Sequence, residues 1–229
     1  MVPLIVIRPE PGCAATAEAA RALGLETVAQ PLFAIEPRSW QAPLAADFDA
    51  LLIGSANVLR HGGRGLDALK NLPVYAVGET TAQAARERGF TVAASGSGGL
   101  QAVVDMLPPG TRHVLRLAGD ERVPLTLPKA MTMEERVTYA SVPCPFTPGL
   151  IDLLRRPAIV AVHSAEAMRH LTAQCVSHAI RRSPLRIAAL GPRIAQAAEA
   201  GWGEVAVAQA PNDKALLALA RQMCQDPFP

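Results

Sequence analysis

Three motifs occur twice along this chain, in the same order and at nearly constant spacing. An apolar run that leads into Ser55 matches a second run that leads into Ser164. The Ala-rich stretch after Gly78 likewise matches the stretch after Gly191. Further along the chain, the helical pattern that begins at Leu100 matches the one that begins at Leu216. One match could arise by chance among Ala-rich helices, but three in the same order indicate a duplicated structural unit. The sequence therefore predicts two similar domains.

Short apolar runs alternate with helical patterns along the chain. The runs are continuously apolar rather than alternating, which is typical of parallel strands buried on both faces. Strand–helix–strand repetition favours an α/β fold with right-handed crossovers. We therefore predict two similar parallel-sheet α/β domains of the flavodoxin or Rossmann-like type. The predicted strands are 4–7, 50–53, 74–77, 91–94, 114–117, 158–162, 187–190 and 205–208, and the predicted helices include 81–88, 100–107, 194–200 and 214–223.

Two longer extended segments interrupt this pattern. Residues 27–37 contain Pro31 and Pro37, and residues 136–145 also contain prolines. Because proline cannot donate to a sheet ladder, it does not suit a central strand. Both segments are predicted to be connectors or edge strands.

Composition excludes several classes of protein. Half of the 229 residues are apolar and only 18% are charged, which excludes an intrinsically disordered chain. The net charge of +2 provides no general attraction to nucleic acid. No apolar run approaches the length of a membrane helix, and the N-terminus does not resemble a signal peptide. The four cysteines form no Cys-x-x-Cys pair and are expected to be reduced thiols, mostly buried, in the cytoplasm. The histidine spacing predicts no metal site.

Four strand ends run directly into predicted helices. Such junctions expose backbone N–H groups at the positive end of the helix dipole, and small residues let an anion approach them. Ordinary helix capping by Ser55, Thr80 and Ser164 is the alternative for any single junction. Four equivalent junctions at the carboxyl ends of parallel strands favour ligand binding instead. The junctions are Gly54-Ser55-Ala56-Asn57, Gly78-Glu79-Thr80-Thr81, His163-Ser164-Ala165 and Gly191-Pro192-Arg193.

Two arginines and one tyrosine are further candidates. Arg8 ends the first predicted strand and Arg116 interrupts another. A guanidinium there needs a partner, either a structural carboxylate or an anionic ligand. Tyr139, on the second connector, presents a phenol that could act as a general acid or simply pack. Tyr75 lies inside an apolar run and is predicted to be structural.

Familiar signatures of other site types are missing. The chain has no phosphate-binding Gly-x-x-x-x-Gly-Lys motif and no Gly-x-Ser-x-Gly elbow. The Gly-rich stretch from Gly96 places Gln101 where a dinucleotide fingerprint has its third glycine, so it predicts only a turn and a helix start.

The order of these motifs resembles the uroporphyrinogen-III synthase family over essentially the whole chain. The resemblance implies two α/β domains joined by a two-stranded antiparallel connector, one domain built from both chain ends and the other from the middle. The expected bounds are 1–35 plus 146–229 for the first domain and 39–138 for the second, with connectors near 30–38 and 136–145. The motifs that carry the resemblance are Ile-Arg8-Pro-Glu, Gly-Ser55-Ala-Asn57-Val, Gly78-Glu-Thr80-Thr-Ala, Leu-Arg116-Leu-Ala-Gly119, Arg-Val-Thr-Tyr139, Val-His-Ser164-Ala and Leu-Gly191-Pro192.

The resemblance further implies a cofactor-free enzyme that acts on hydroxymethylbilane, a linear tetrapyrrole with eight carboxylates. The enzyme eliminates water, inverts ring D and closes the ring to uroporphyrinogen III. We expect a cytoplasmic monomer that binds this small molecule and neither nucleic acid nor a membrane. Tyr139 matches the family's motif tyrosine, which assists loss of the hydroxyl group, and is the expected catalytic residue. The expected substrate-binding residues are Arg8, Ser55, Ala56, Asn57, Gly78, Glu79, Thr80, Arg116, Ser164, Ala165, Gly191, Pro192 and Arg193.

The second half of the chain departs from the family pattern. His163-Ser164-Ala165-Glu166 stands where the family usually has Ser-Pro-Ser or Ser-x-Ser-Ala. Arg193 and Ile194 stand where it usually has threonines, and Ile194 cannot bind through its side chain. A non-enzymatic two-domain protein that binds a small polycarboxylate is therefore the alternative. A synthase that has lost activity and retains only binding is a second alternative.

Overall fold

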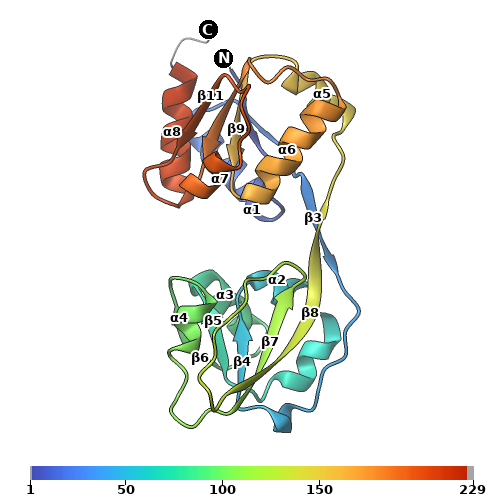
Figure 1. Ribbon diagram of the computed structural model, residues 1–229, viewed down its shortest axis with the longest axis vertical. Helices are drawn as coiled ribbons and strands as arrows, with labels where there is room; N and C mark the ends of the chain where they lie inside the picture. Colours follow the sequence, from blue (N-terminus) through green and yellow to red (C-terminus); the bar gives the residue numbers. More distant parts are fainter. Residues whose placement is uncertain (1, 226–229) are drawn as a thin grey trace. The chain divides into compact units, whose positions relative to one another are not determined.

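The computed structural model describes residues 2–225 and divides into two compact units (Figure 1). We call Met1–Ala34 with Val142–Pro229 the terminal unit and Ile35–Ser141 the middle unit. Each unit has its own sheet with a hydrophobic core on either face. The predicted α/β class with two similar sheet domains is confirmed.

The terminal unit contains a five-stranded sheet in the order β11-β10-β9-β1-β2, with every neighbouring pair parallel. Helices α5, α6 and α7 cover one face, and α1 and α8 cover the other. Figure 1 shows α8 on one side of this sheet and α5 and α6 on the opposite side. The elements are β1 (Leu4–Val6), α1 (Gly12–Ala22), β2 (Thr27–Ala29), α5 (Pro148–Leu154), β9 (Ala158–Val162), α6 (Ala165–Ser177), β10 (Leu185–Ala189), α7 (Pro192–Gln196), β11 (Glu204–Val207) and α8 (Asp213–Gln225).

The middle unit contains a six-stranded sheet in the order β3-β8-β7-β4-β5-β6. The pairs from β8 to β6 are all parallel, and the sheet is mixed, so the antiparallel pair is β3 with β8. The elements are β3 (Phe33–Pro37), η1 (Ala45–Asp47), β4 (Ala50–Ile53), α2 (Ala56–His61), η2 (Gly63–Leu69), β5 (Val74–Val77), α3 (Glu79–Glu87), β6 (Val92–Gly96), α4 (Leu100–Val104), β7 (His113–Gly119) and β8 (Thr132–Pro143).

The second predicted connector differs from the structure. Strand β8 begins at Thr132, before the predicted start at 136, and it lies between β3 and β7 rather than at an edge. Its charged residues are tolerated because they pair with neighbours: Glu135 accepts hydrogen bonds from Arg116 and Arg122. The edge-strand alternative for this segment was therefore wrong, whereas its role as a connector near 136–145 stays a prediction.

Two helices are shorter than predicted. Helix α4 ends at Val104, before the predicted end at 107, and α7 covers Pro192–Gln196 where 194–200 was predicted. Ile194 is buried in the core of the terminal unit, as its side chain requires.

The four cysteines are at least partly buried, and the helices are short. Cys13 and Cys175 are buried and Cys144 and Cys224 are half-buried, all as free thiols. Burial raises the pKa of the Cys13 and Cys175 thiols to about 11, so both are neutral at pH 7. Among residues 2–225, no helix has the length and apolar character needed to cross a membrane.

Candidate active site

The carboxyl edge of the middle-unit sheet brings several predicted residues to one level. Ile53 of β4 lies opposite Ala76 of β5 and Leu117 of β7, so the loops after these strands begin side by side. One of them contains Ser55 and another contains Gly78. In the same sheet, Gly119 at the end of β7 lies opposite Tyr139 of β8. Tyr139 is therefore on the same edge as two of the predicted junctions.

The three residues for which helix capping is the alternative to ligand binding behave differently. The Ser55 Oγ accepts a hydrogen bond from the Asn57 N–H at 3.2 Å, and the Ser164 Oγ accepts one from the Ala167 N–H at 3.0 Å. Capping by these two serines is confirmed. Capping by Thr80 was wrong, because Gly78 holds the N-cap position with a φ of 74°, which glycine adopts without strain. Thr80 lies exposed in the first turn of α3, and its hydroxyl forms no hydrogen bond within residues 2–225.

The side chain of Glu79 is engaged with its own helix. Its carboxylate accepts a 2.6 Å bond from Arg86 and a 3.4 Å bond from the Ser95 hydroxyl. The hydrogen bond and charge of Arg86 lower the pKa of Glu79, so the group is ionised at pH 7. An ionised carboxylate repels other anions, so Glu79 could assist anion binding only through its backbone N–H.

The remaining junction residues after β4 contribute mainly packing and local bonds. Ala56 is buried, and the Asn57 Oδ1 accepts a 3.2 Å bond from the exposed Arg60. Helix α2 is only one and a half turns long and ends at His61. The centroid of the His61 ring lies 6.5 Å from that of the Tyr139 ring. Burial, together with the nearby charge of Arg60, lowers the pKa of His61, so this imidazole is neutral at pH 7.

Tyr139 has a packed ring and an available hydroxyl. The half-buried ring packs against the core beneath α2 and α3. On its other side it lies close to Gly119, and a methyl group at that position would come within 2.8 Å of Cε2 and Cζ. Within the described chain, the Tyr139 hydroxyl has no hydrogen-bond partner. The phenol is thus fixed in place while its proton can be donated to a ligand.

Arg116 does not join this group. It lies opposite Leu52, below the level at which the strands end, and its side chain is 6% exposed. Its Nη1 donates to Glu135 Oε1 at 2.8 Å and to the Val123 carbonyl at 3.0 Å. These contacts are those of a structural arginine, and substrate binding by Arg116 stays a prediction without support from its surroundings.

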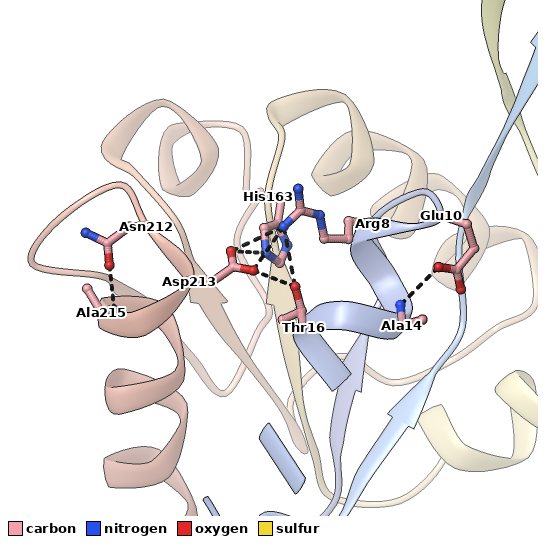
Figure 2. Close-up of polar contacts among 8 residues, drawn as sticks. All are labelled: Arg8, Glu10, Ala14, Thr16, His163, Asn212, Asp213 and Ala215. Atoms are coloured by element: carbon pink, nitrogen blue, oxygen red, sulfur yellow. Dashed lines mark hydrogen bonds and ion pairs between the residues drawn. The ribbon is translucent and has the colours of Figure 1, made fainter. Parts of the chain in front are cut away.

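The carboxyl edge of the terminal-unit sheet holds a second polar cluster, formed by Arg8, Thr16, His163 and Asp213 (Figure 2). Asp213 lies at its centre, at the start of α8. Its carboxylate accepts bonds from Arg8 Nη1 at 3.1 Å and from the Thr16 hydroxyl at 2.6 Å. The Nε2 of His163, the residue after β9, lies 3.1 Å from Asp213 Oδ1. The remaining edge of the Arg8 guanidinium lies against Gly12, where a methyl group would come within 2.5 Å of Nε.

The cluster has one ion pair and a neutral imidazole. Burial raises the pKa of Asp213, but the Thr16 hydrogen bond, the charge of His163 when that ring is protonated, and the charge of Arg8 outweigh it, so the pKa is lowered overall. Burial, and next the charge of Arg8, lower the pKa of His163. At pH 7 the cluster therefore contains Arg8 as a cation, Asp213 as an anion and His163 uncharged.

The strand-to-helix junctions of the terminal unit offer fewer side chains for ligand binding than those of the middle unit. Ser164 is used as a cap, and Ala165 begins α6 beside it. Gly191 has extended backbone, Pro192 begins the short helix α7, and Arg193 is exposed. Arg193 forms no ion pair within residues 2–225. Its guanidinium is free to meet an anion from solvent.

Comparison with known proteins decides the family. The family model described as uroporphyrinogen-III synthase HemD matches residues 14–218, which is most of the chain. The chain belongs to the uroporphyrinogen-III synthase family. The resemblance recognised from the motifs is confirmed, and with it the prediction of a lyase-type enzyme of tetrapyrrole biosynthesis. No observation favours the alternative of a non-enzymatic binding protein.

Solved structures of uroporphyrinogen-III synthases share the fold. The Helicobacter pylori enzyme matches with a TM-score of 0.66 and 17% identity, over 97% of this chain and 100% of that one. A mutant of the Thermus thermophilus enzyme matches with a TM-score of 0.57 and 19% identity, over 99% and 100% of the two chains. A comparison with curated protein sequences gave no match.

In this member of the uroporphyrinogen-III synthase family, sequence reasoning missed part of the terminal-unit cluster. Asp213, Thr16 and His163 were not predicted as polar partners of Arg8. Asp213 carried a usable signal, because an acidic residue at the start of a helix after the last strand falls on the carboxyl edge of a parallel sheet. Thr16 carried none, since a threonine within a helix usually packs or faces solvent.

Proposed function

We propose that this chain catalyses the closure of hydroxymethylbilane to uroporphyrinogen III. Membership of the family, established over residues 14–218, carries the proposal. The fixed Tyr139 ring with its unbonded hydroxyl at the carboxyl edge of a parallel sheet supports it, because open α/β sheets bind ligands at that edge.

In the proposed reaction Tyr139 acts as a general acid. The substrate hydroxyl leaves with the C–O electron pair and takes the phenol proton, which gives water and an azafulvene cation. The substituted carbon of ring D attacks this cation and forms a spiro intermediate. The bond from that carbon to the bridge of ring C then breaks with its electron pair left on ring D, and the free α-carbon of ring D attacks the bridge cation, which inverts the ring. A ring carbon then loses a proton, which restores the phenol. The sequence is redox-neutral and balanced without a cofactor, so we propose that none is used.

Guidance of the chain ends is the second task of the protein. An unguided azafulvene cation closes without inversion, to the type I isomer. Holding the substrate so that ring D attacks through its substituted carbon is a problem of orientation, which binding energy can solve. We propose that backbone N–H groups in the first turn of α3 bind substrate carboxylates, with Ser55 and Thr80 as polar neighbours in the same unit.

We further propose that the enzyme is a cytoplasmic monomer that binds neither nucleic acid nor a membrane. The near-zero net charge and the free thiols support this. Light scattering on the purified protein would measure its mass against the 24.1 kDa of one chain. A mass of twice that value would contradict the monomer.

The proposed activity is tested by incubating the purified chain with freshly prepared hydroxymethylbilane and separating the oxidised porphyrin isomers. We expect mainly type III product, at a rate proportional to protein concentration. Heat-denatured protein is the control and is expected to give only the type I isomer. Only type I product from the folded protein would exclude the enzyme function.

A further inference from the structure

Gly119 and a β-bulge beside it fix where the Tyr139 phenol lies. In the β7–β8 ladder Ala118 lies opposite Val137, but the next residue, Gly119, lies opposite Tyr139 rather than Thr138. The extra residue, Thr138, is fully buried, and its hydroxyl donates to the Ala118 carbonyl at 3.3 Å. The register shift adds one residue to β8 between these two pairs, as a β-bulge does, and bulges are frequent beside active sites. Here it brings Tyr139 into register with a glycine.

The contact between Gly119 and the phenol involves the end that carries the hydroxyl. A methyl group on Gly119 would lie 2.8 Å from Cε2 and Cζ of Tyr139 and 3.1 Å from its hydroxyl oxygen. Carbon atoms do not approach that closely without displacement, so the phenol would have to move. The backbone cannot yield easily, because the Asp120 N–H donates to the Tyr139 carbonyl at 3.0 Å. The rest of the ring is packed against the middle-unit core.

The requirement for glycine at this position is therefore one of space. Gly119 is a buried strand residue whose φ lies outside the left-handed region, so its backbone conformation is open to any amino acid. Alanine there is tolerated by the backbone, and the three atoms nearest to its methyl group would all belong to Tyr139. Because Gly119 has no side chain, the phenol hydroxyl of Tyr139 can occupy its present position.

We propose that Gly119 is a positioning residue for the reaction, acting through Tyr139, with the bulge at Thr138 as its complement. The inference rests on the proposed function, in which the Tyr139 hydroxyl donates a proton to the leaving group. Proton transfer in the transition state is sensitive to placement, because the donor must reach hydrogen-bond distance of the leaving oxygen. Gly119 sets that placement without touching the substrate.

The test compares Gly119→Ala with the parent in steady-state kinetics. We expect kcat to fall by about tenfold or more, with KM within roughly twofold, since the interaction lost is made in the transition state. In a Tyr139→Phe background, Gly119→Ala is expected to have no further effect on kcat. A merely structural glycine would lower activity equally in both backgrounds, and that result, or normal turnover of folded Gly119→Ala, would overturn the inference.

Gly65→Ala is the matched control. A methyl group at Gly65 would lie 2.9 Å from Cζ2 of Trp40, so the substitution crowds an aromatic ring of the same unit to a similar degree. We expect its kcat to stay near that of the parent. An equal loss of kcat in Gly65→Ala and Gly119→Ala would attribute the effect to general crowding and contradict the proposal.

Two further measurements keep the inference testable. If Gly119→Ala does not fold, Thr138→Val removes the hydroxyl bond that holds the bulge while keeping the side-chain volume. Its kcat is expected to fall less than that of Gly119→Ala, and only when Tyr139 is present; an unchanged kcat would contradict the proposal.

Aromatic NMR signals of Tyr139, assigned with Tyr139→Phe, are expected to shift in Gly119→Ala and stay in place in Gly65→Ala. Unshifted Tyr139 signals would overturn the inference about Gly119, whichever isomer the parent produces. Formation of only the type I isomer by the parent would instead contradict the proposed function.

Discussion

The carboxyl edges of the two sheets use their polar side chains in opposite ways. In the terminal unit, Arg8, Asp213 and their neighbours bind one another. In the middle unit, the hydroxyls of Thr80 and Tyr139 form no hydrogen bond within residues 2–225. The internal repeat predicted equivalent edges, but equivalent folds provide only equivalent positions. The polar side chains therefore stabilise the fold at the terminal-unit edge, whereas at the middle-unit edge two hydroxyls are available to bind a ligand.

Charge reinforces this contrast. The Arg8 cation is neutralised by Asp213, and His163 is uncharged at pH 7, so this cluster offers little attraction for a further anion. A substrate carboxylate could bind Nη1 of Arg8 only by competing with Asp213. We therefore expect the terminal-unit cluster to contribute mainly stability, and the middle-unit edge to contribute mainly catalysis.

The largest effect is expected for Tyr139→Phe, which removes only the unbonded hydroxyl of the middle-unit edge. A general-acid contribution is typically about 100- to 10,000-fold. We expect kcat to fall by about 100-fold, the lower end of that range, because the electron-rich pyrrole already activates the leaving group. KM should change little, as the proton is donated in the transition state. Turnover within about twofold of the parent would show that Tyr139 only packs.

The next effect is on the stability of the terminal unit. Asp213→Ala leaves the buried Thr16 hydroxyl and the His163 Nε2 without an acceptor or partner. An unsatisfied buried group costs about 1–3 kcal/mol, and because Asp213 is 40% exposed we expect about 1–2 kcal/mol lost from the free energy of unfolding. Urea denaturation measures this loss.

Glu79→Ala provides the control from the other edge. Its ion pair with Arg86 is exposed, so its removal should leave the unfolding midpoint unchanged. Equal destabilisation by the two substitutions would remove the distinction between a structural edge and an open one.

A smaller effect is expected for Thr80→Leu in the first turn of α3. The exposed hydroxyl supports no structure, so the variant should fold normally while its bulk blocks the helix N-terminus. Loss of one hydrogen bond is worth about 0.5–1.5 kcal/mol, which corresponds to a roughly two- to twelvefold higher KM. Gln83→Leu, exposed on the same helix but beyond its first turn, is the control and should keep the parent's KM. An unchanged KM in folded Thr80→Leu would count against carboxylate binding at this junction.

The elements predicted best from the sequence are those fixed by local pattern. Ala50–Ile53, Val74–Val77 and Ala158–Val162 are strands with the predicted bounds, because a continuously apolar run has few alternatives to a buried strand. The start of β8 was missed because Glu135 reads as polar until its partner Arg116 on β7 is known. A pair that depends on strand order cannot be read from one segment.

The candidate site shows the same limit. Strand-to-helix junctions are local, so Ser55 and Ser164 were predicted as possible caps and are caps. The alternative of capping by Thr80 does not hold, because Gly78 occupies the N-cap with a positive φ, and the sequence alone does not show which of several adjacent residues will start the helix. The bond from Arg8 to Asp213 joins residues from opposite ends of the chain, so only the folded sheet brings them together.

The smallest effect concerns pH, and it should appear in the terminal unit. The pKa of His163 is lowered in the folded state, chiefly by burial, so the unfolded chain binds the proton more readily. The free energy of unfolding should therefore decrease as pH falls below the ordinary histidine value of 6.5. The pKa of Asp213 is also lowered overall, so a further loss should follow as pH falls below 3.8. Urea midpoints measured between pH 8 and pH 5 test the histidine contribution, which His163→Gln should remove. A midpoint that rises toward pH 5, or a His163→Gln variant with the parent's pH dependence, would mean that His163 does not link protonation to the stability of this edge.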